Sequence, residues 1–132
     1  MAGPEFKITF KGADALVRRF KELAARLPIA IESALVREAE ETITEAKLIT
    51  PVDEGVLRAS GHVQQPKRDG PRVSVEAGFG GPAAPYALFV HEDLTAHHPV
   101  GQAKFLEVPV NKRRGSFAGR LAARVDAALG RR

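Results

Sequence analysis

The spacing of apolar residues in the first half of the chain predicts one short strand and two helices. Apolar and polar residues alternate over residues 6–10, which predicts a strand, because alternate side chains of a strand share one face. Apolar residues then recur at helical spacing and predict an amphipathic helix from about residue 13 to residue 27, which Pro28 interrupts. These apolar residues are Leu16, Phe20, Leu23 and Leu27.

A second and longer helix has the clearest pattern in the chain. Its apolar residues are spaced by four, four, three, four and three positions, so that one face would be buried over about five turns. They are Ile31, Leu35, Ala39, Thr42, Ala46 and Ile49. Pro51 disfavours the helical conformation at Thr50, so we expect this helix to end near Ile49 and to form the spine of the domain.

The middle of the chain is expected to be extended. Residues 56–65 and 72–79 are predicted to form an antiparallel hairpin, with its turn at residues 66–71, where an Asp-Gly-Pro sequence occurs. A loop rich in glycine and proline follows at residues 78–85. The short apolar segment at residues 86–90 fits a helix and a strand equally well.

The last third of the chain is predicted to be a polar loop at residues 92–101, a packed apolar segment at residues 105–108 and a final helix. The apolar positions of this helix are Phe117, Leu121, Val125 and Ala128, and the tail at residues 130–132 is expected to fray. Together the elements predict a single α+β domain over residues 1–132, in which the long central helix and the C-terminal helix pack on a small antiparallel β-sheet.

Composition narrows the classes of protein that fit. The chain has 132 residues, which is the size of one domain, and it has no cysteine, which excludes disulfides, thiolate metal sites and cysteine nucleophiles. No apolar run reaches the length of a membrane span, and the first residues lack the pattern of a signal peptide. We therefore expect no membrane partner and no export.

The net charge of +4 is unevenly distributed along the chain. The acidic row, defined as Glu38, Glu41 and Glu45, would lie beside the apolar face of the long helix. The basic row, defined as Arg113, Arg120, Arg124 and Arg131, would lie beside the apolar face of the last helix if residues 113–131 are helical throughout. We expect the two rows to face each other across subunit boundaries in a head-to-tail ring, with two solvated faces as the alternative.

The most specific motif follows the long helix. Residues 50–60 have the sequence Thr-Pro-Val-Asp-Glu-Gly-Val-Leu-Arg-Ala-Ser. Physically, Pro51 would stop the helix, Asp53 would accept local backbone amides, Gly55 would allow a positive backbone angle, and Leu57 would return to the core ahead of Arg58. The stretch resembles the hallmark turn of the neck, or tail-completion, proteins of long-tailed bacteriophages, which has threonine where this chain has Glu54.

Two further stretches extend the resemblance, which covers roughly residues 31–129. Residues 85–92 resemble the tyrosine-alanine segment of the family, and residues 101–109 resemble its phenylalanine-leucine entry to the last helix. The His91-Glu92 pair is more similar to a branch of phage minor capsid proteins.

The resemblance implies a structural virion protein at the head-tail junction, located in the host cytoplasm during assembly. From the residues themselves we expect no enzymatic activity and no cofactor. The resemblance also implies a ring of identical subunits, six-fold by expectation. The ring would contact a head-closure or connector protein on one side and a tail terminator or tail tube protein on the other. The alternatives are a minor capsid protein and a nonspecific DNA-binding protein that lines the DNA channel.

The loop at residues 91–98 contains the best candidate groups for chemistry. Its histidines and carboxylates could hold a divalent metal, but Thr95 stands where a second histidine ligand would be needed, so we favour an exposed polar loop without a metal. The residues of this region that we expect to contact neighbouring rings are Tyr86, His91, Glu92, His97, His98 and Phe105. No serine lies in a nucleophile-elbow context, and the C-terminal segment lacks exposed aromatic residues for base stacking, so only nonspecific DNA contact remains open.

Overall fold

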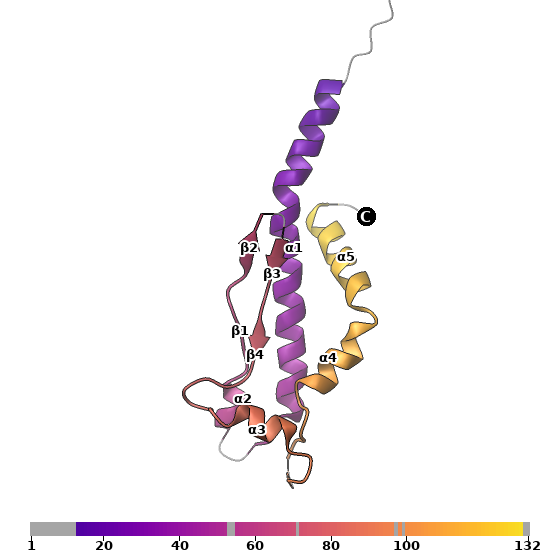
Figure 1. The fold of residues 1–132 in the computed structure, drawn as a ribbon. Coiled ribbons are helices and arrows are strands. Elements are labelled where there is room, and N and C mark those ends of the chain that lie inside the picture. Colours follow the sequence, from indigo (N-terminus) through magenta and orange to yellow (C-terminus); the bar gives the residue numbers. More distant parts are fainter. Residues whose placement is uncertain (1–12, 53–54, 71, 97, 99, 131–132) are drawn as a thin grey trace, which may run out of the picture.

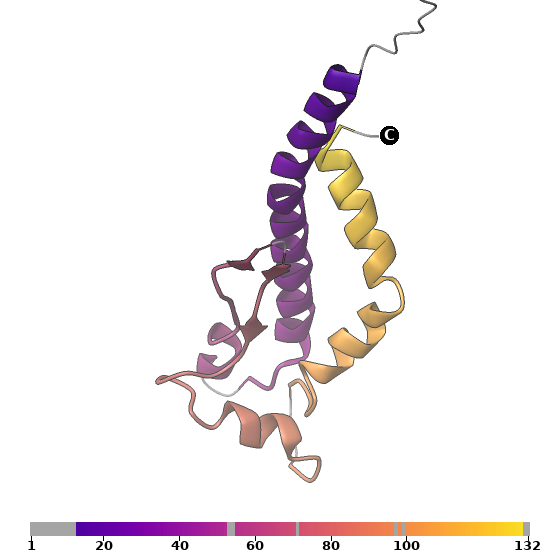
Figure 2. The same cartoon turned by 45° about the horizontal axis from the view of Figure 1, so that its top comes forward.

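The structure, a computed structural model, describes residues 13–52, 55–70, 72–96, 98 and 100–130. One long helix, α1 (Ala13–Ile49), forms the axis of the molecule (Figure 1). A β-hairpin runs along one side of α1, and two C-terminal helices run along another side, as the second view also shows (Figure 2). The strand expected at residues 6–10 lies outside the described residues.

The other elements follow α1 along the chain. The helices are α2 (Val56–Ala59), α3 (Ala87–Glu92), α4 (Glu107–Arg114) and α5 (Phe117–Ala128). The strands are β1 (His62–Val63), β2 (Lys67–Asp69), β3 (Arg72–Ser74) and β4 (Ala77–Gly78). The predicted α+β class, with a long central helix, a C-terminal helix and a small antiparallel sheet, is confirmed. Both the hairpin and the C-terminal helices pack on α1, which lies between them.

Helix α1 combines two segments that the sequence predicted as separate helices. The predicted interruption at Pro28 is wrong, because α1 continues through this residue. Proline removes the hydrogen bond to the carbonyl four residues earlier, but the good helix formers on both sides keep the remaining bonds. The indigo N-terminal part of α1 leans away from the rest in Figure 1, as helices do at a proline. The predicted end of the helix at Ile49 is confirmed.

The predicted hairpin is confirmed, and its last pair before the turn is Asp69 opposite Arg72. β1 pairs antiparallel with β4, with Val63 opposite Ala77. β2 pairs antiparallel with β3, with Arg68 opposite Val73. Arg68 also donates to Glu32 on α1 (Nε to Oε2, 2.6 Å), which ties the far end of the hairpin to the helix.

A β-bulge separates the two halves of the hairpin. The register differs by one residue on its two sides, so that Gln65 and Pro66 together lie opposite the single residue Val75. Proline has no N–H for a β-ladder, and a bulge is a position at which a strand accepts it. The hairpin therefore continues through residues 67–69, which were expected to belong to the turn.

The predicted start of the first hairpin strand at residue 56 is wrong. Residues Val56–Ala59 form α2, which begins after Gly55 in the left-handed conformation (φ 81°). Leu57 is buried in the core, and this packing outweighs the preference of Val56 for extended structure.

The remaining helices answer one question that the sequence left open and divide one predicted segment. The segment at residues 86–90 is helical from Ala87, where α3 begins, and Tyr86 is the N-cap of α3. The predicted final helix is confirmed as α5, but the residues before it form a separate helix, α4, because helical continuity breaks at Gly115 and Ser116.

The core lies beside the C-terminal end of α1, and its centre consists of Leu57, Ala84, Ala87 and Phe105. The expected packing of residues 105–108 is confirmed at Phe105, whose ring meets that of Phe79 edge-on at 5.0 Å. Among the described residues, eight hydrophobic side chains are buried, and five of these are alanines. In the same part of the chain, no helix has both the length and the apolar character that crossing a membrane requires.

Candidate functional site

The acidic row and the basic row meet within one chain. The three glutamates are spaced by three and four positions and share one face of α1, which we call the cluster face. α4 and α5 pack on α1, and their arginines reach this face: Arg113 comes from α4, and Arg120 and Arg124 come from α5. Arg131 lies outside the described residues.

Glu38 is the centre of this ion-pair cluster. Its side chain is 9% exposed and accepts five hydrogen bonds from three arginines. Arg113 and Arg120 each bind it through Nε and Nη2, at distances of 2.5–3.1 Å. Arg124 Nη1 adds a bond of 3.0 Å. Bidentate arginine-carboxylate pairs have a fixed geometry, so Glu38 holds α4 and α5 in position on α1.

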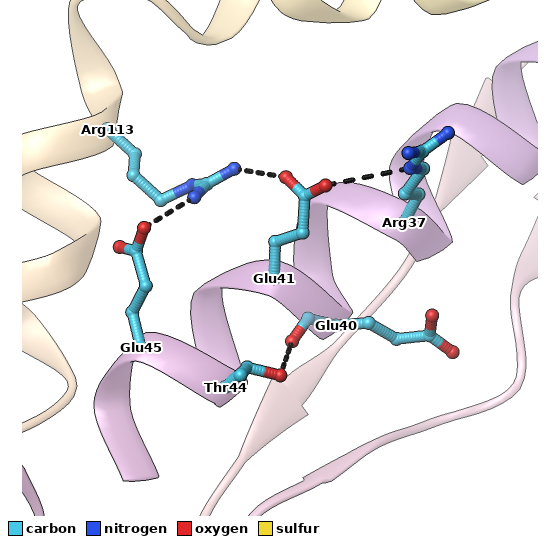
Figure 3. Close-up of a pocket in the computed structure, with 6 residues that line it drawn as sticks. All are labelled: Arg37, Glu40, Glu41, Thr44, Glu45 and Arg113. Carbon is cyan, nitrogen blue, oxygen red and sulfur yellow. Dashed lines mark hydrogen bonds and ion pairs between the residues drawn. The ribbon is translucent and has the colours of Figure 1, made fainter. Parts of the chain in front are cut away.

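The other two glutamates bind the outer side of the cluster. Arg113 Nη2 donates to Glu41 Oε2 (2.7 Å) and Nη1 donates to Glu45 Oε1 (2.9 Å), so its guanidinium lies between the two carboxylates (Figure 3). Arg124 also donates to Glu41 (2.6 Å), and Arg37 approaches the same carboxylate at 3.5 Å. This side of the cluster lines an open hollow on the surface.

The arginines keep Glu38 and Glu41 ionised. Hydrogen bonds from Arg120 and then from Arg113 lower the pKa of Glu38 to about 2. Bonds from Arg124 and Arg113 lower the pKa of Glu41, and Glu38 in turn raises the pKa of Arg113. Three carboxylates and three guanidinium groups therefore neutralise one another at neutral pH, and the cluster acts as a structural clamp.

The pairing of the two rows was predicted, but its location was wrong. The rows were expected to meet across a subunit boundary, and in the structure they meet inside one chain. The break at Gly115 and Ser116 lets α4 and α5 both follow α1, so the arginines reach their own glutamates. These side chains are therefore already paired within the subunit. The six residues concerned are Glu38, Glu41, Glu45, Arg113, Arg120 and Arg124.

The motif that carries the family resemblance forms a buried corner at the end of α1. Thr50 and Pro51 are buried, and Thr50 Oγ1 donates to a carbonyl of the last turn of α1 (2.7 Å). The loop before α4 crosses this corner, where the Gln102 N–H donates to the carbonyl of Ile49 (2.8 Å). Gly101 has a φ of +87°, and a Cβ atom there would lie 2.5 Å from the carbonyl carbon of Thr50. Only glycine fits this approach.

The remaining motif residues also have structural positions. Pro51 follows the end of α1, Gly55 has the expected positive φ of 81°, and Leu57 is buried in the core, so these three predictions are confirmed. Arg58 is half-buried on α2. Asp53 lies outside the described residues.

A second polar cluster joins α3 to the start of α4. His91 Nε2 accepts the N–H of Glu107 (3.3 Å), so the proton is on Nδ1, which donates to Glu92 Oε1 (2.9 Å). Lys104 contacts Glu92 and Glu107. Hydrogen bonds from Lys104 and then from His91 lower the pKa of Glu92. The imidazole of His91 is thus held by α4 and by its own neighbour, which leaves it a structural role.

One residue expected to contact neighbouring rings is in the wrong place to do so. Phe105 is 1% exposed, and its ring packs edge-on against the rings of Phe79 and His91, each at 5.0 Å. The prediction of a contact role for Phe105 is therefore wrong, because the core needs this side chain.

The other residues of that group differ in exposure. Tyr86 and Glu92 are exposed, whereas His91 and His98 are half-buried. His97 lies outside the described residues. Among the residues that the structure describes, no three His, Asp or Glu side chains are grouped so that they could hold a metal ion.

Two exposed apolar surfaces were not predicted as sites. The N-terminal arm, residues 17–27 of α1, extends beyond the hairpin and α5 (Figure 1) and includes Phe20, which is 62% exposed. The α3 patch surrounds a shallow surface hollow and consists of Leu88, Phe89, Glu92 and Asp93. Helical spacing predicted the amphipathic helix that contains the arm, but spacing alone does not show which of its apolar residues another element will cover.

Comparisons of this chain with protein-family models, with curated proteins and with solved structures found no match. The resemblance to phage neck proteins therefore stays an expectation that rests on short motifs.

Proposed function

We propose that the protein is a structural component of a bacteriophage particle, located at the junction of head and tail. Copies of the chain form a ring, six-fold by expectation, between the head-side connector and the tail terminator or tail tube. The proposal assigns the protein no catalytic reaction.

The observation that carries the proposal is that the three stretches resembling the family meet in space. Leu57, Ala87 and Phe105, one from each stretch, lie together in the centre of the core. Next to the buried Thr50, the third stretch is hydrogen-bonded to the last residue of α1, because the Gln102 N–H donates to the carbonyl of Ile49. Motifs far apart in sequence therefore build one compact unit, as expected if they define a common fold.

The balance of buried and exposed apolar residues supports a role in assembly. Among the described residues, eight hydrophobic side chains are buried, most of them small, whereas twelve large ones are exposed. Soluble monomers rarely expose contiguous apolar surface without a use for it. A subunit that covers such surface in contact with its neighbours gives a direct reason for this distribution.

Channel lining by nonspecific DNA binding has less support. Phosphate binding requires free Lys and Arg side chains. Three of the cations in residues 102–132, namely Arg113, Arg120 and Arg124, are paired with glutamates in the ion-pair cluster. The basic segment therefore offers less positive charge to DNA than its sequence suggested.

Removal of the gene from the virus that encodes this chain tests the proposal. We expect filled heads and free tails that fail to join, and we expect a tagged copy to be located at the neck in electron micrographs. Normal particles in the absence of the protein would contradict the proposal. Label distributed over the capsid shell would also contradict it, in favour of a minor capsid protein.

A further inference from the structure

The cluster face of α1 continues past the end of α5, where no other element of the described residues packs on it. Residues spaced by three or four positions occupy this face along most of the helix. They are Phe20, Leu23, Leu27, Ala30, Ala34, Glu38, Glu41 and Glu45. α5 ends at Ala128, whose carbonyl accepts a hydrogen bond from Arg26 (3.3 Å). Beyond this point the face is apolar, and Leu27 and Phe20 are exposed.

The α3 patch is a second apolar surface that the fold leaves open. Leu88 and Phe89 are 73% and 72% exposed, although they lie on a helix whose other face packs in the core through Ala87. One turn later along α3, Glu92 and Asp93 border the same hollow. The patch thus combines two large apolar side chains with two carboxylates.

The two surfaces have opposite charge. The arm carries four cations and one anion, which are Arg18, Arg19, Lys21, Arg26 and Glu22. Both carboxylates of the patch are ionised at neutral pH, because Lys104 lowers the pKa of Glu92 and Thr95 lowers that of Asp93. Lys104 pairs with Glu92 within the chain, so Asp93 carries most of the negative charge that the patch offers to a second copy. Pairing two arms would bring like charges together, whereas an arm against a patch brings opposite charges together.

The two surfaces also lie at opposite ends of the molecule. In Figure 1 the arm is at the top of α1, and α3 is beside its lower end, with the hairpin and α5 between them. They cannot meet within one chain, so a contact between them joins two copies. Each copy then keeps one free surface of each kind, and such head-to-tail contacts close into a ring or continue as a filament.

We infer that the N-terminal arm of one copy docks on the α3 patch of the next copy. Phe20 packs against Leu88 and Phe89, and the cations of the arm lie beside Glu92 and Asp93. This contact specifies how neighbouring subunits of the proposed ring are joined. That the copies close into a ring and do not continue as a filament rests on the proposed function.

The size of the two surfaces indicates a weak contact between any two copies. Together, Val17, Phe20, Leu27, Leu88 and Phe89 expose roughly 500 Å² of side-chain surface. Stable protein pairs bury about 1,200 Å² or more in total. A subunit in a closed ring uses both of its surfaces, so we expect association to increase steeply with concentration.

Sedimentation velocity of the full chain at increasing concentration tests the contact. Phe20→Glu and Phe89→Glu are each expected to weaken self-association by about tenfold or more. Phe20→Glu brings a carboxylate to the acidic patch, and Phe89→Glu removes the apolar ring against which Phe20 packs and leaves a charged group in that contact. Ile29→Glu is the matched control. Ile29 is 59% exposed, but it lies nine residues from Phe20, on the opposite face of α1. The Ile29→Glu variant should therefore associate as the wild type does. Circular dichroism checks that all variants keep the same helix content.

A mixture of the two variants gives the sharpest result. The Phe20→Glu chain keeps an intact patch, and the Phe89→Glu chain keeps an intact arm. One productive contact then remains, so the mixture is expected to stop at a pair of one copy of each. Association of Phe89→Glu alone at wild-type strength would contradict the inference and indicate arm-to-arm pairing.

The outcomes separate this contact from the proposed function. If the wild type forms rings and both variants also form them, the docking inference is wrong and the ring stands. If the wild type stays monomeric at every concentration, both are contradicted. The wild type could also stay monomeric and bind DNA or anionic vesicles in a manner that depends on Phe20. That result overturns the inference and assigns the arm to the partner that it binds.

Discussion

The middle of α1 and its N-terminal arm share one face but differ in what covers it. In the middle, α4 and α5 cover charged residues, and Glu38 is buried. On the arm, the same face consists of apolar residues, and Phe20 is 62% exposed. This is the reverse of the usual arrangement, in which apolar residues are inside and charged residues outside.

The difference shows that the covering elements, and not the residue type alone, decide burial on this helix. α5 carries arginines that match the glutamates of the middle, and it ends at Ala128, before the arm begins. The charged part of the face therefore stabilises the subunit, and the described elements leave the apolar part exposed. Substitutions in the covered middle of α1 should therefore change the free energy of unfolding more than substitutions on the arm do.

The largest expected effect comes from Glu38→Gln. The substitution keeps the shape of the side chain but leaves three guanidinium groups together without their central anion. Breaking a buried ion pair by removing one partner costs about 3–5 kcal/mol. We expect a loss of this size in the free energy of unfolding, measured by urea denaturation at neutral pH.

Glu40→Gln is the control for this measurement. Glu40 is exposed and lies two residues from Glu38, outside the acidic row. Its change should stay within about 0.5 kcal/mol. Equal losses for the two variants would mean that the cluster does not stabilise the fold.

Acid should weaken the protein through the same carboxylate. The pKa of Glu38 is about 2 in the folded chain and 4.5 in its ordinary state, so the unfolded chain takes up the proton first as the pH falls. The stabilisation is complete above pH 4.5 and is lost as the pH approaches 2, and the gap corresponds to about 3 kcal/mol. Urea denaturation of wild type and Glu38→Gln across this range should show their difference shrinking with falling pH. If the stabilities of wild type and Glu38→Gln fall in parallel with falling pH, the loss of stability in acid is caused by other carboxylates.

Much of the fold followed from local patterns in the sequence. The end of α1 at Ile49, the chain reversal between Asp69 and Arg72 and the last helix were predicted correctly, because proline, glycine and helical spacing act over a few residues. Failures occurred where distant contacts decide the conformation. The burial of Leu57 makes α2 a helix, and the bulge at Pro66 extends the hairpin past the expected turn.

The candidate site was predicted in its chemistry and not in its location. Charge spacing identified Glu38 and its arginine partners, but a row of charges has the same pattern whether it meets its own chain or a neighbour. The break at Gly115 and Ser116 decides between them, and it has no strong sequence signal beyond one glycine. Phe105 was assigned both to packing and to a contact loop, and its complete burial shows that packing takes precedence.

Two alanines, one on the covered part of the face and one on the arm, give a smaller effect that compares the middle of α1 with the arm. Ala34 is 3% exposed and lies on the covered part of the face, whereas Ala24 lies on the arm and is exposed. Ala34→Leu forces three extra carbons into a packed contact and should cost about 1–3 kcal/mol. Ala24→Leu should change stability by less than about 0.5 kcal/mol, because leucine and alanine both favour helices. Thermal unfolding of the two variants measures the contrast, and a similar loss at Ala24 would mean that the arm is covered within the chain.

The smallest expected effect concerns an ion pair on the arm. Arg19 lies 3.8 Å from Glu22, and both side chains are more than half exposed, in contrast to the buried pairs of Glu38. Exposed pairs on a helix contribute about 0.3–0.5 kcal/mol, because water screens the charges and ordering two long side chains costs entropy. Arg19→Gln should therefore leave urea denaturation unchanged within about 0.5 kcal/mol, whereas Arg113→Gln, which leaves Glu38 short of a bidentate partner, should lower stability several-fold more. If the two variants lose the same stability, burial does not separate the two parts of α1 in energy, and the comparison on which the arm is assigned to a partner fails.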